Sequence, residues 1–176
     1  EFRGRPLATP RSQAIRPTTD RTREAVFNVL VHRFEEKLEG ARVLDLFAGT
    51  GALGLEALSR GAAHCLFVES DREAVSVLQR NIARLGAMDR VEMRTQAVEY
   101  AVPPARPCDL IFMDPPYASG LAAMALGRMC NSGWVAPGGF VSVETNGERL
   151  TVPPGFATEA ERRFGKAHIL LLRREG

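Results

Sequence analysis

The sequence predicts an α/β domain built on a mostly parallel sheet. Short apolar runs typical of buried strands alternate with segments of helical spacing between residues 42 and 143. A glycine-rich turn follows the first apolar run, as in many nucleotide-binding folds. The last two runs, 157–164 and 167–173, flank Gly165-Lys166 and predict an antiparallel hairpin that closes the sheet edge. With 176 residues, 45% of them hydrophobic, the chain suits one domain with a sizeable core.

The chain divides into an arm, residues 1–17, and a single domain, residues 18–176. The arm contains Gly4 and three prolines without sustained periodicity, so we expect an extended or mobile segment. A helix can begin at residues 18–20, where Thr19 or Asp20 offers an N-cap. Apolar residues then follow at helical spacing, namely Val26, Val29, Leu30 and Phe34. We expect this helix to pack on the domain.

The remaining elements alternate in order. The first buried strand is expected at 42–47. The pattern then predicts helices at about 52–59, 71–84 and 119–130, and strands at 65–68, 91–93, 109–113 and 140–143. Pro137-Gly138-Gly139 is expected to form the turn that enters the last of these strands.

The positive charge is concentrated at the front of the chain. Residues 1–33 carry seven arginines against three acidic residues, a local net charge of +4, which leaves −2 for the rest. Arginine suits phosphate, because its planar fork binds phosphate oxygens bidentately. The charge therefore fits a phosphate-binding arm, and it fits a solvated tail equally well.

Asp114-Pro115-Pro116-Tyr117 follows the most apolar strand of the chain. Proline has no N–H and a fixed φ, so these two prolines end the strand and leave carbonyl groups pointing outward. A flat ligand could stack on Tyr117 while its N–H groups reach Asp114 and the carbonyl of Pro115. Two prolines by themselves favour an ordinary turn, and the functional interpretation depends on a second motif.

That second motif is a glycine loop, Gly49-Thr50-Gly51-Ala52-Leu53-Gly54, placed between a predicted strand and a predicted helix. An acidic residue, Glu69, stands twenty positions after Gly49, as in dinucleotide-binding folds. Asp45, however, would place a carboxylate beside a bound pyrophosphate, which Coulomb repulsion disfavours.

A cationic ligand is favoured instead. S-adenosylmethionine combines a sulfonium for Asp45 with ribose hydroxyls for Glu69. Both carboxylates could alternatively be ordinary strand-end groups. Gln96 and Ala97 follow the third strand, where an adenine edge is expected, and Gln96 is as compatible with a solvated turn.

Several classes of protein are disfavoured. Cys65, Cys108 and Cys130 form no metal-ligand pattern, and buried Cys65 and Cys108 indicate a reduced, cytoplasmic setting. The three histidines are scattered, so no metal is expected. No stretch is apolar enough to span a membrane, and no signal peptide is evident. Trp134 and Phe140 are expected in the core.

The two motifs together resemble the class I S-adenosylmethionine-dependent methyltransferases that modify exocyclic base amines. Three further stretches, 16–28, 51–60 and 68–71, resemble the RsmD family of bacterial 16S rRNA guanine-N2 methyltransferases. The resemblance covers nearly the whole chain from about Arg3. It implies a Rossmann-like sheet of seven strands with helices on both faces. Members of this family usually have a short apolar strand ahead of the stretch that corresponds to Arg3. The family pattern also has an acidic residue before Ala97, where this sequence has Gln96.

The resemblance also implies residue roles. The acceptor motif is Asp114 to Tyr117, with Asp114, Pro115, Pro116 and Tyr117 as its catalytic residues. Cofactor contacts are expected from Asp45, Phe47, Ala48, Gly49, Gly51, Glu69, Ser70, Gln96, Ala97 and Asp114. RNA contacts are expected from Arg3, Arg5, Arg16, Thr18, Arg21 and Arg23. The expected partner is 16S rRNA, presented in an assembled small subunit to a monomeric enzyme.

Three rival functions remain open. A DNA methyltransferase could use the same pocket, although the chain carries no separate target-recognition domain. A nicotinamide-dependent oxidoreductase is disfavoured by Asp45 and by the prolines after Asp114. A non-catalytic nucleotide-binding module would not need Asp114 and Tyr117.

Overall fold

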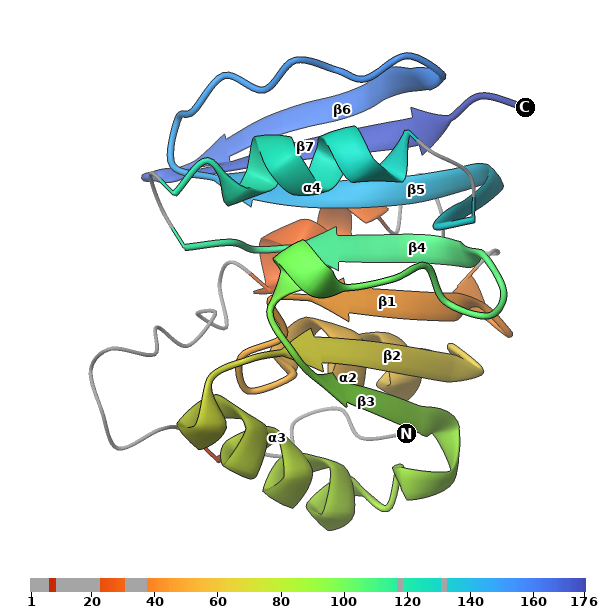
Figure 1. The fold of residues 1–176 in the computed structure, drawn as a ribbon, viewed down its shortest axis with the longest axis vertical. Coiled ribbons are helices and arrows are strands. Elements are labelled where there is room, and N and C mark those ends of the chain that lie inside the picture. The colour runs from red at the N-terminus through yellow and green to blue at the C-terminus, as the bar shows by residue number, and fades with distance from the viewer. Residues whose placement is uncertain (1–6, 9–22, 31–37, 117–118, 131–132) are drawn as a thin grey trace.

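A computed structural model describes residues 7–8, 23–30, 38–116, 119–130 and 133–176. Seven strands form one sheet in the order β3-β2-β1-β4-β5-β7-β6 (Figure 1). The strands are β1 (Arg42–Leu46), β2 (His64–Glu69), β3 (Val91–Thr95), β4 (Cys108–Met113), β5 (Val135–Thr145), β6 (Phe156–Phe164) and β7 (Ala167–Arg174). The first five are mutually parallel, and β7 is antiparallel to β5 and β6. The expected Rossmann-like fold is confirmed.

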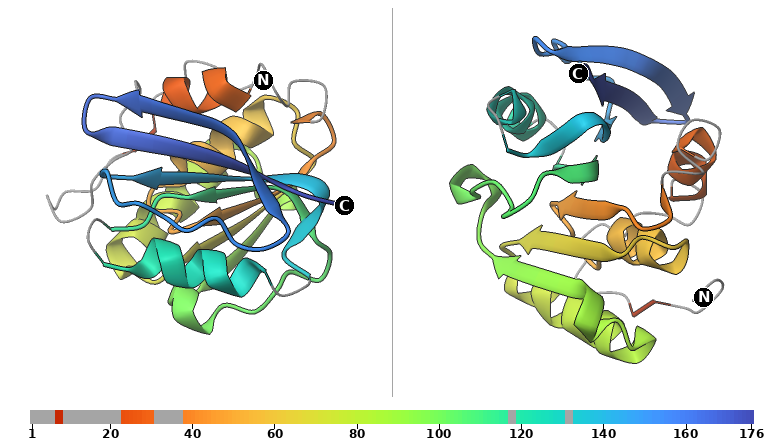
Figure 2. Two further views of the ribbon diagram at one scale, coloured as in Figure 1. Left: turned by 90° about the horizontal axis from the view of Figure 1, so that it is seen from above. Right: turned by 90° about the vertical axis from the view of Figure 1, so that its right-hand side faces the viewer.

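Helices cover both faces of the sheet, as Figure 2 shows. Helices α2 (Ala52–Ser59) and α3 (Arg72–Leu85) share one apolar layer with the helical residues 23–30. Helix α4 (Leu121–Met129) and the short 3-10 helix Val98–Tyr100 cover the opposite face. A second 3-10 turn, Met88–Arg90, leads into β3. Alternating side chains of the buried strands therefore belong to two separate core layers.

Capping explains why α3 begins and ends where it does. The side chain of Asp71 accepts the N–H of Ala74 at 2.8 Å, which satisfies one of the free donors at the helix start. Gly86 ends the helix with φ +65, a left-handed conformation that glycine adopts without steric cost. The helix predicted at 71–84 is therefore confirmed within one residue of each end.

Aromatic packing fixes helix 23–30 on the sheet. The Phe27 ring lies 5.5 Å from the ring of Phe112 on β4, and the guanidinium of Arg60 lies 4.6 Å above the Phe27 ring. Phe27 and Phe112 are both fully buried. Helix 23–30 thus packs against β4 at Phe112, two residues before Asp114. Its predicted N-cap at residues 18–20, and Phe34, lie outside the described residues.

One predicted boundary is wrong. Pro137-Gly138-Gly139 was expected to precede the strand, yet these residues lie inside β5, which begins at Val135. The pairing with β4 shifts at this point, from Cys108 opposite Val135 to Leu110 opposite Phe140. Gly138 has a φ of +72, which makes this irregularity possible. The turn residues therefore form a bulge within β5 and do not mark where the strand begins.

Other predictions about the core are confirmed. Cys65 and Cys108 are free and buried, and burial raises the pKa of the Cys108 thiol to about 12. Trp134 and Phe140 are buried in the two core layers.

Within the described residues, no helix is long and apolar enough to cross a membrane.

Candidate cofactor and acceptor site

The candidate site lies at the carboxyl ends of the parallel strands. β1 pairs with β2 on one side and with β4 on the other, so the chain crosses over in opposite directions from the centre of the sheet. Open α/β sheets bind their ligands at such a switch point. The glycine loop follows β1 here, and Asp114 follows β4.

Two glycines let helix α2 pack closely, Gly51 against α3 and Gly54 against β2. A Cβ on Gly51 would lie 2.3 Å from Cδ1 of Leu78, and a Cβ on Gly54 would lie 2.4 Å from Cε1 of Phe67. A side chain at Gly54 would displace the Phe67 ring, and Gly51 has in addition a left-handed φ of +81 that favours glycine. Gly49 has the opposite surroundings, because nothing lies within 4 Å of its ideal Cβ. The loop therefore packs tightly at its helical end and faces open space at Gly49.

Glu69 holds the open end of this loop. Its Oε2 accepts the N–H of Gly49 at 2.7 Å, and its Oε1 accepts the N–H groups of Ser70 and Asp71, each at 2.8 Å. A carboxylate has about four acceptor positions, so this one retains capacity for a further donor. The predicted ribose-binding residue is thus also the residue that fastens the loop to the end of β2.

Asp45 is a buried carboxylate inside the site. It is 2% exposed, and its Oδ2 accepts the N–H of Gly54 at 2.9 Å. Burial raises the pKa of Asp45 well above its usual value; the bond from Gly54 opposes that shift, and the charges of Asp114 and Glu69 add to it. Three carboxylates therefore share one small region, which suits a cationic ligand.

Phe47 stores backbone strain between Asp45 and the loop. Its φ is +60, and among the described residues it is the one non-glycine residue with a positive φ. This conformation is rare for a bulky side chain and occurs preferentially at functional sites. The next residue, Ala48, is buried, and its N–H donates to the carbonyl of Val68 at 3.1 Å.

The predicted adenine contacts lie beside Glu69. The N–H of Gln96 donates to the carbonyl of Glu69 at 3.1 Å, so the end of β3 is tied to the end of β2. Gln96 and Ala97 are half-buried. The structure thus brings together the predicted cofactor residues from β1, β2 and β3 on one edge.

The acceptor motif forms one wall of a cleft. Pro115 is buried and Pro116 exposed, and the Pro116 carbonyl accepts the hydroxyl of Ser119 at 2.7 Å. Both prolines line a cleft of about 400 Å³, together with Gly120, Ala122, Glu144, Thr145, Asn146, Gly147 and Glu148. A hollow of about 490 Å³ lies at the opposite edge, around Gly40 and Ala62, away from every predicted site residue.

Several predicted residues lie outside the described part of the chain. They are Tyr117, Arg3, Arg5, Arg16, Thr18 and Arg21. Arg23 is described, and its Nε lies 3.9 Å from Oε2 of Glu56 on α2. Its role toward RNA stays a prediction. Among the described residues, no group of three potential ligands could hold a metal ion.

Sequence reasoning missed two polar residues at this site. Asn81 is fully buried on α3, and its Nδ2 donates to the Thr50 carbonyl at 3.0 Å. Its Oδ1 accepts the N–H of Ala8 at 2.8 Å, so it joins the arm to the glycine loop. Glu144, the second residue, is buried at the end of β5. Asn81 occupies an apolar helix face, which is the one signal that could have drawn attention to it.

Comparison with known proteins decides the family. A family model described as Conserved hypothetical protein 95 matches residues 1–173. The chain belongs to this family. Ribosomal RNA small subunit methyltransferase D of Escherichia coli is 37% identical over 177 residues, which cover 99% of this chain and 87% of that protein. The resemblance to the RsmD family is therefore confirmed.

Solved structures support the family assignment and the fold. The yhhF protein of Escherichia coli superposes with a TM-score of 0.86 at 34% identity, over 99% of this chain and 94% of that one. An RNA methyltransferase from Salinibacter ruber, solved with S-adenosyl-L-homocysteine, has a TM-score of 0.70 at 14% identity, over 91% and 94% of the two chains. At 14% identity, the Salinibacter ruber structure supports the fold and nothing more.

Proposed function

We propose that this chain transfers the methyl group of S-adenosylmethionine to the exocyclic N2 of a guanine in 16S rRNA. The observation that carries the proposal is the position of Asp45, Glu69 and Asp114 at the ends of three neighbouring strands around the glycine loop. The relative named as a small-subunit rRNA methyltransferase supports the reaction and the class of substrate.

The cofactor is the first part of the proposal. Glu69, with acceptor capacity left after its three backbone bonds, would bind ribose hydroxyls. The buried carboxylate of Asp45 would face the positive part of the ligand, and Gln96 and Ala97 would border the adenine. Phe47, Ala48, Gly49, Gly51 and Ser70 would contribute backbone. When bound, S-adenosylmethionine supplies an electrophilic methyl group.

The acceptor amine needs orientation more than acid–base help. The lone pair on guanine N2 is delocalised into the ring, so the free amine is a poor nucleophile. Asp114 and the Pro115 carbonyl would accept its two N–H hydrogens and direct the lone pair at the methyl carbon. Positioning of this kind can supply about 7–11 kcal/mol of the barrier.

The methyl transfer breaks one bond as it forms another. Guanine N2 attacks the methyl carbon, the N–C bond forms as the C–S bond breaks, and S-adenosylhomocysteine leaves. One N2 proton then passes to Asp114, which also stabilises the positive charge that develops on nitrogen. Tyr117 would stack on the target base, an interaction worth about 1–3 kcal/mol.

The basic N-terminal arm, residues 1–17, would supply phosphate contacts ahead of the single domain 18–176. Arg3, Arg5 and Arg16 of the arm, with Thr18, Arg21 and Arg23 at the start of the domain, would bind the backbone of the RNA and set its register, without reading its sequence. We further propose that the substrate is the assembled small subunit and that the enzyme acts as a monomer in the cytoplasm.

Methyl transfer from labelled S-adenosylmethionine tests the proposal. Small subunits from cells lacking the modification, naked 16S rRNA and duplex DNA are offered in parallel. Label in N2-methylguanine, strongest on the subunit, is the expected result. Label found in DNA alone would refute the RNA substrate while keeping the cofactor. Tight binding of NAD in calorimetry, without binding of S-adenosylmethionine, would refute the reaction.

A further inference from the structure

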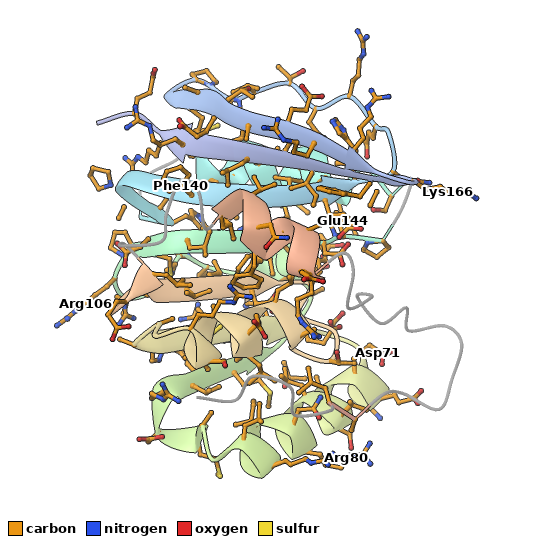
Figure 3. The ribbon with its side chains drawn as sticks, turned by 180° about the vertical axis from the view of Figure 1, so that it is seen from behind. Asp71, Arg80, Arg106, Phe140, Glu144 and Lys166 are labelled. Carbon is orange, nitrogen blue, oxygen red and sulfur yellow. The ribbon has the colours of Figure 1, made fainter. Side chains whose placement is uncertain are left out.

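Glu144 lies beside Asp114 across two parallel strands. Met113 on β4 is paired with Val143 on β5, so the next residue of each chain segment, Asp114 and Glu144, stand side by side at the carboxyl edge. Neighbouring strands are about 4.8 Å apart, which places these two acidic residues within reach of one small ligand. Figure 3 shows Glu144 at this edge of the sheet, on the side of helix 23–30.

Strand alternation assigns the two residues to the same face of the sheet. Phe112 and Phe140 belong to the core layer under helix 23–30, and Asp114 and Glu144 follow them by two and four residues. Side chains alternate along a strand, so both carboxylates extend that face. Glu144 is only 5% exposed, and it lines the cleft whose wall includes Pro115 and Pro116.

We propose that Glu144 is the residue that selects guanine, by accepting the N1–H of the target base while Asp114 accepts from its N2 amine. This inference rests on the proposed function and adds to it a base-reading group from β5. The role assigned to Glu144 is recognition, and the methyl transfer itself needs only Asp114 and the Pro115 carbonyl.

The hydrogen-bonding pattern of the bases explains the selection. An ionised carboxylate accepts hydrogen bonds and cannot donate them. Guanine places a second donor, N1–H, directly beside its exocyclic amine. Adenine, cytosine and 2,6-diaminopurine place ring-nitrogen acceptors beside theirs, and a buried carboxylate facing such an acceptor repels it. Sites built to hydrogen-bond a substrate group reject analogues lacking that group by factors of about 10⁴.

A single base substitution in the substrate tests this directly. Small subunits are reconstituted with either guanine or 2,6-diaminopurine at the nucleotide that labelled methyl transfer identifies. Both bases carry the N2 amine, and they differ at N1, where only guanine has a hydrogen. The wild-type enzyme is expected to favour guanine by at least about a hundredfold in kcat/KM. Equal rates on the two bases would overturn the proposal without any variant.

The variant Glu144→Gln then tests the residue. A glutamine amide can donate to N1 of diaminopurine as well as accept from guanine, so the preference for guanine should fall at least tenfold. The matched control is Glu148→Gln, the same change in the same cleft at an exposed position, and it should keep the wild-type preference. Calorimetry with S-adenosylmethionine checks that both variants bind cofactor normally.

The outcomes separate this inference from the proposed function. Wild-type enzyme that labels guanine, together with a Glu144→Gln variant of unchanged base preference, refutes the role of Glu144 alone. Wild-type enzyme that labels no guanine in any RNA refutes the proposed function. A preference that falls in Glu144→Gln and persists in Glu148→Gln supports both.

Discussion

The amide of Asn81 donates to the carbonyl of Thr50 at 3.0 Å, which fastens the middle of α3 to the glycine loop. The two residues are 31 positions apart in the chain, and both are buried. The same side chain also accepts the N–H of Ala8. One buried amide therefore bonds both the glycine loop and Ala8 of the arm.

We expect Asn81→Leu to loosen both segments. It leaves the Thr50 carbonyl and the Ala8 N–H without this partner, at a cost of about 1–3 kcal/mol in unfolding free energy. Amide exchange at Ala8 should accelerate, and the Kd for S-adenosylmethionine should rise. Asn146→Leu, an exposed asparagine in the cleft wall, is the control. Unchanged exchange at Ala8 would show that Asn81 does not hold the arm.

Asp45→Asn should stabilise the folded protein and weaken its binding of the cofactor. Folding raises the pKa of Asp45 from its ordinary value of 3.8 because the carboxyl is buried. The native state thus holds this proton more tightly than the unfolded chain does, so stability falls as the pH rises from about 3.8 through the raised value. Asparagine removes that loss and can still accept the N–H of Gly54.

The measurement is thermal unfolding of Asp45→Asn and wild type between pH 3 and pH 8. We expect a higher Tm for the variant at pH 7, an advantage that vanishes near pH 3, and cofactor affinity about tenfold lower or worse. Asp109→Asn is the matched control, since Oδ2 of Asp109 also accepts a backbone N–H, from Arg42 at 2.8 Å, away from the site. A variant less stable than wild type at pH 7 would contradict this account.

Asp114→Ala should separate binding from catalysis. Most of the cofactor affinity should survive the loss of the contact expected from Asp114, because the loop geometry, Asp45 and Glu69 are untouched, while methylation falls by orders of magnitude as the amine loses its acceptor. Single-turnover transfer to small subunits, alongside calorimetry with S-adenosylmethionine, distinguishes the two effects. Turnover close to wild type would remove Asp114 from the mechanism.

Gly54→Ala should destabilise the fold by overpacking. The added Cβ would lie 2.4 Å from Phe67 and 2.6 Å from the sulfur of Cys65, contacts that cost about 1–3 kcal/mol of unfolding free energy. Gly127→Ala is a matched helical change with nothing within 4 Å, and it should stabilise by about 0.5–1 kcal/mol. Urea unfolding followed by circular dichroism measures both, and equal effects would argue against close packing at Gly54.

RNA binding by the arm should depend on salt. Arg16→Ala should weaken binding to 16S rRNA and reduce the slope of log Kd against log salt by about one contact. Arg106→Ala removes the same charge on the side of the molecule away from Asp71 and Glu144, as Figure 3 shows, and should leave the slope unchanged. Identical slopes for all three proteins would exclude a phosphate contact by Arg16.

Local patterns were enough to predict most of the fold. Strands and helices follow apolar periodicity, which is local, and Asp71 and Gly86 mark the ends of α3 through backbone chemistry that the sequence states directly. The glycine loop and the acceptor motif were also readable, because close packing at Gly54 and the rigid Pro115-Pro116 turn restrict residue type at fixed spacing. The bulge at Gly138 escaped prediction, since a turn signal does not say whether pairing continues beyond it.

The sequence by itself therefore determined the alternation of elements, the family and the residues of both motifs. Only the tertiary structure decided which distant residues meet the residues of these motifs. The register of β4 and β5 places Glu144 beside Asp114, and the docking of α3 places Asn81 under the glycine loop. These pairs are 30 and 31 residues apart in the chain, and no local pattern specifies them, because strand register and helix docking are set by the packing of the whole core.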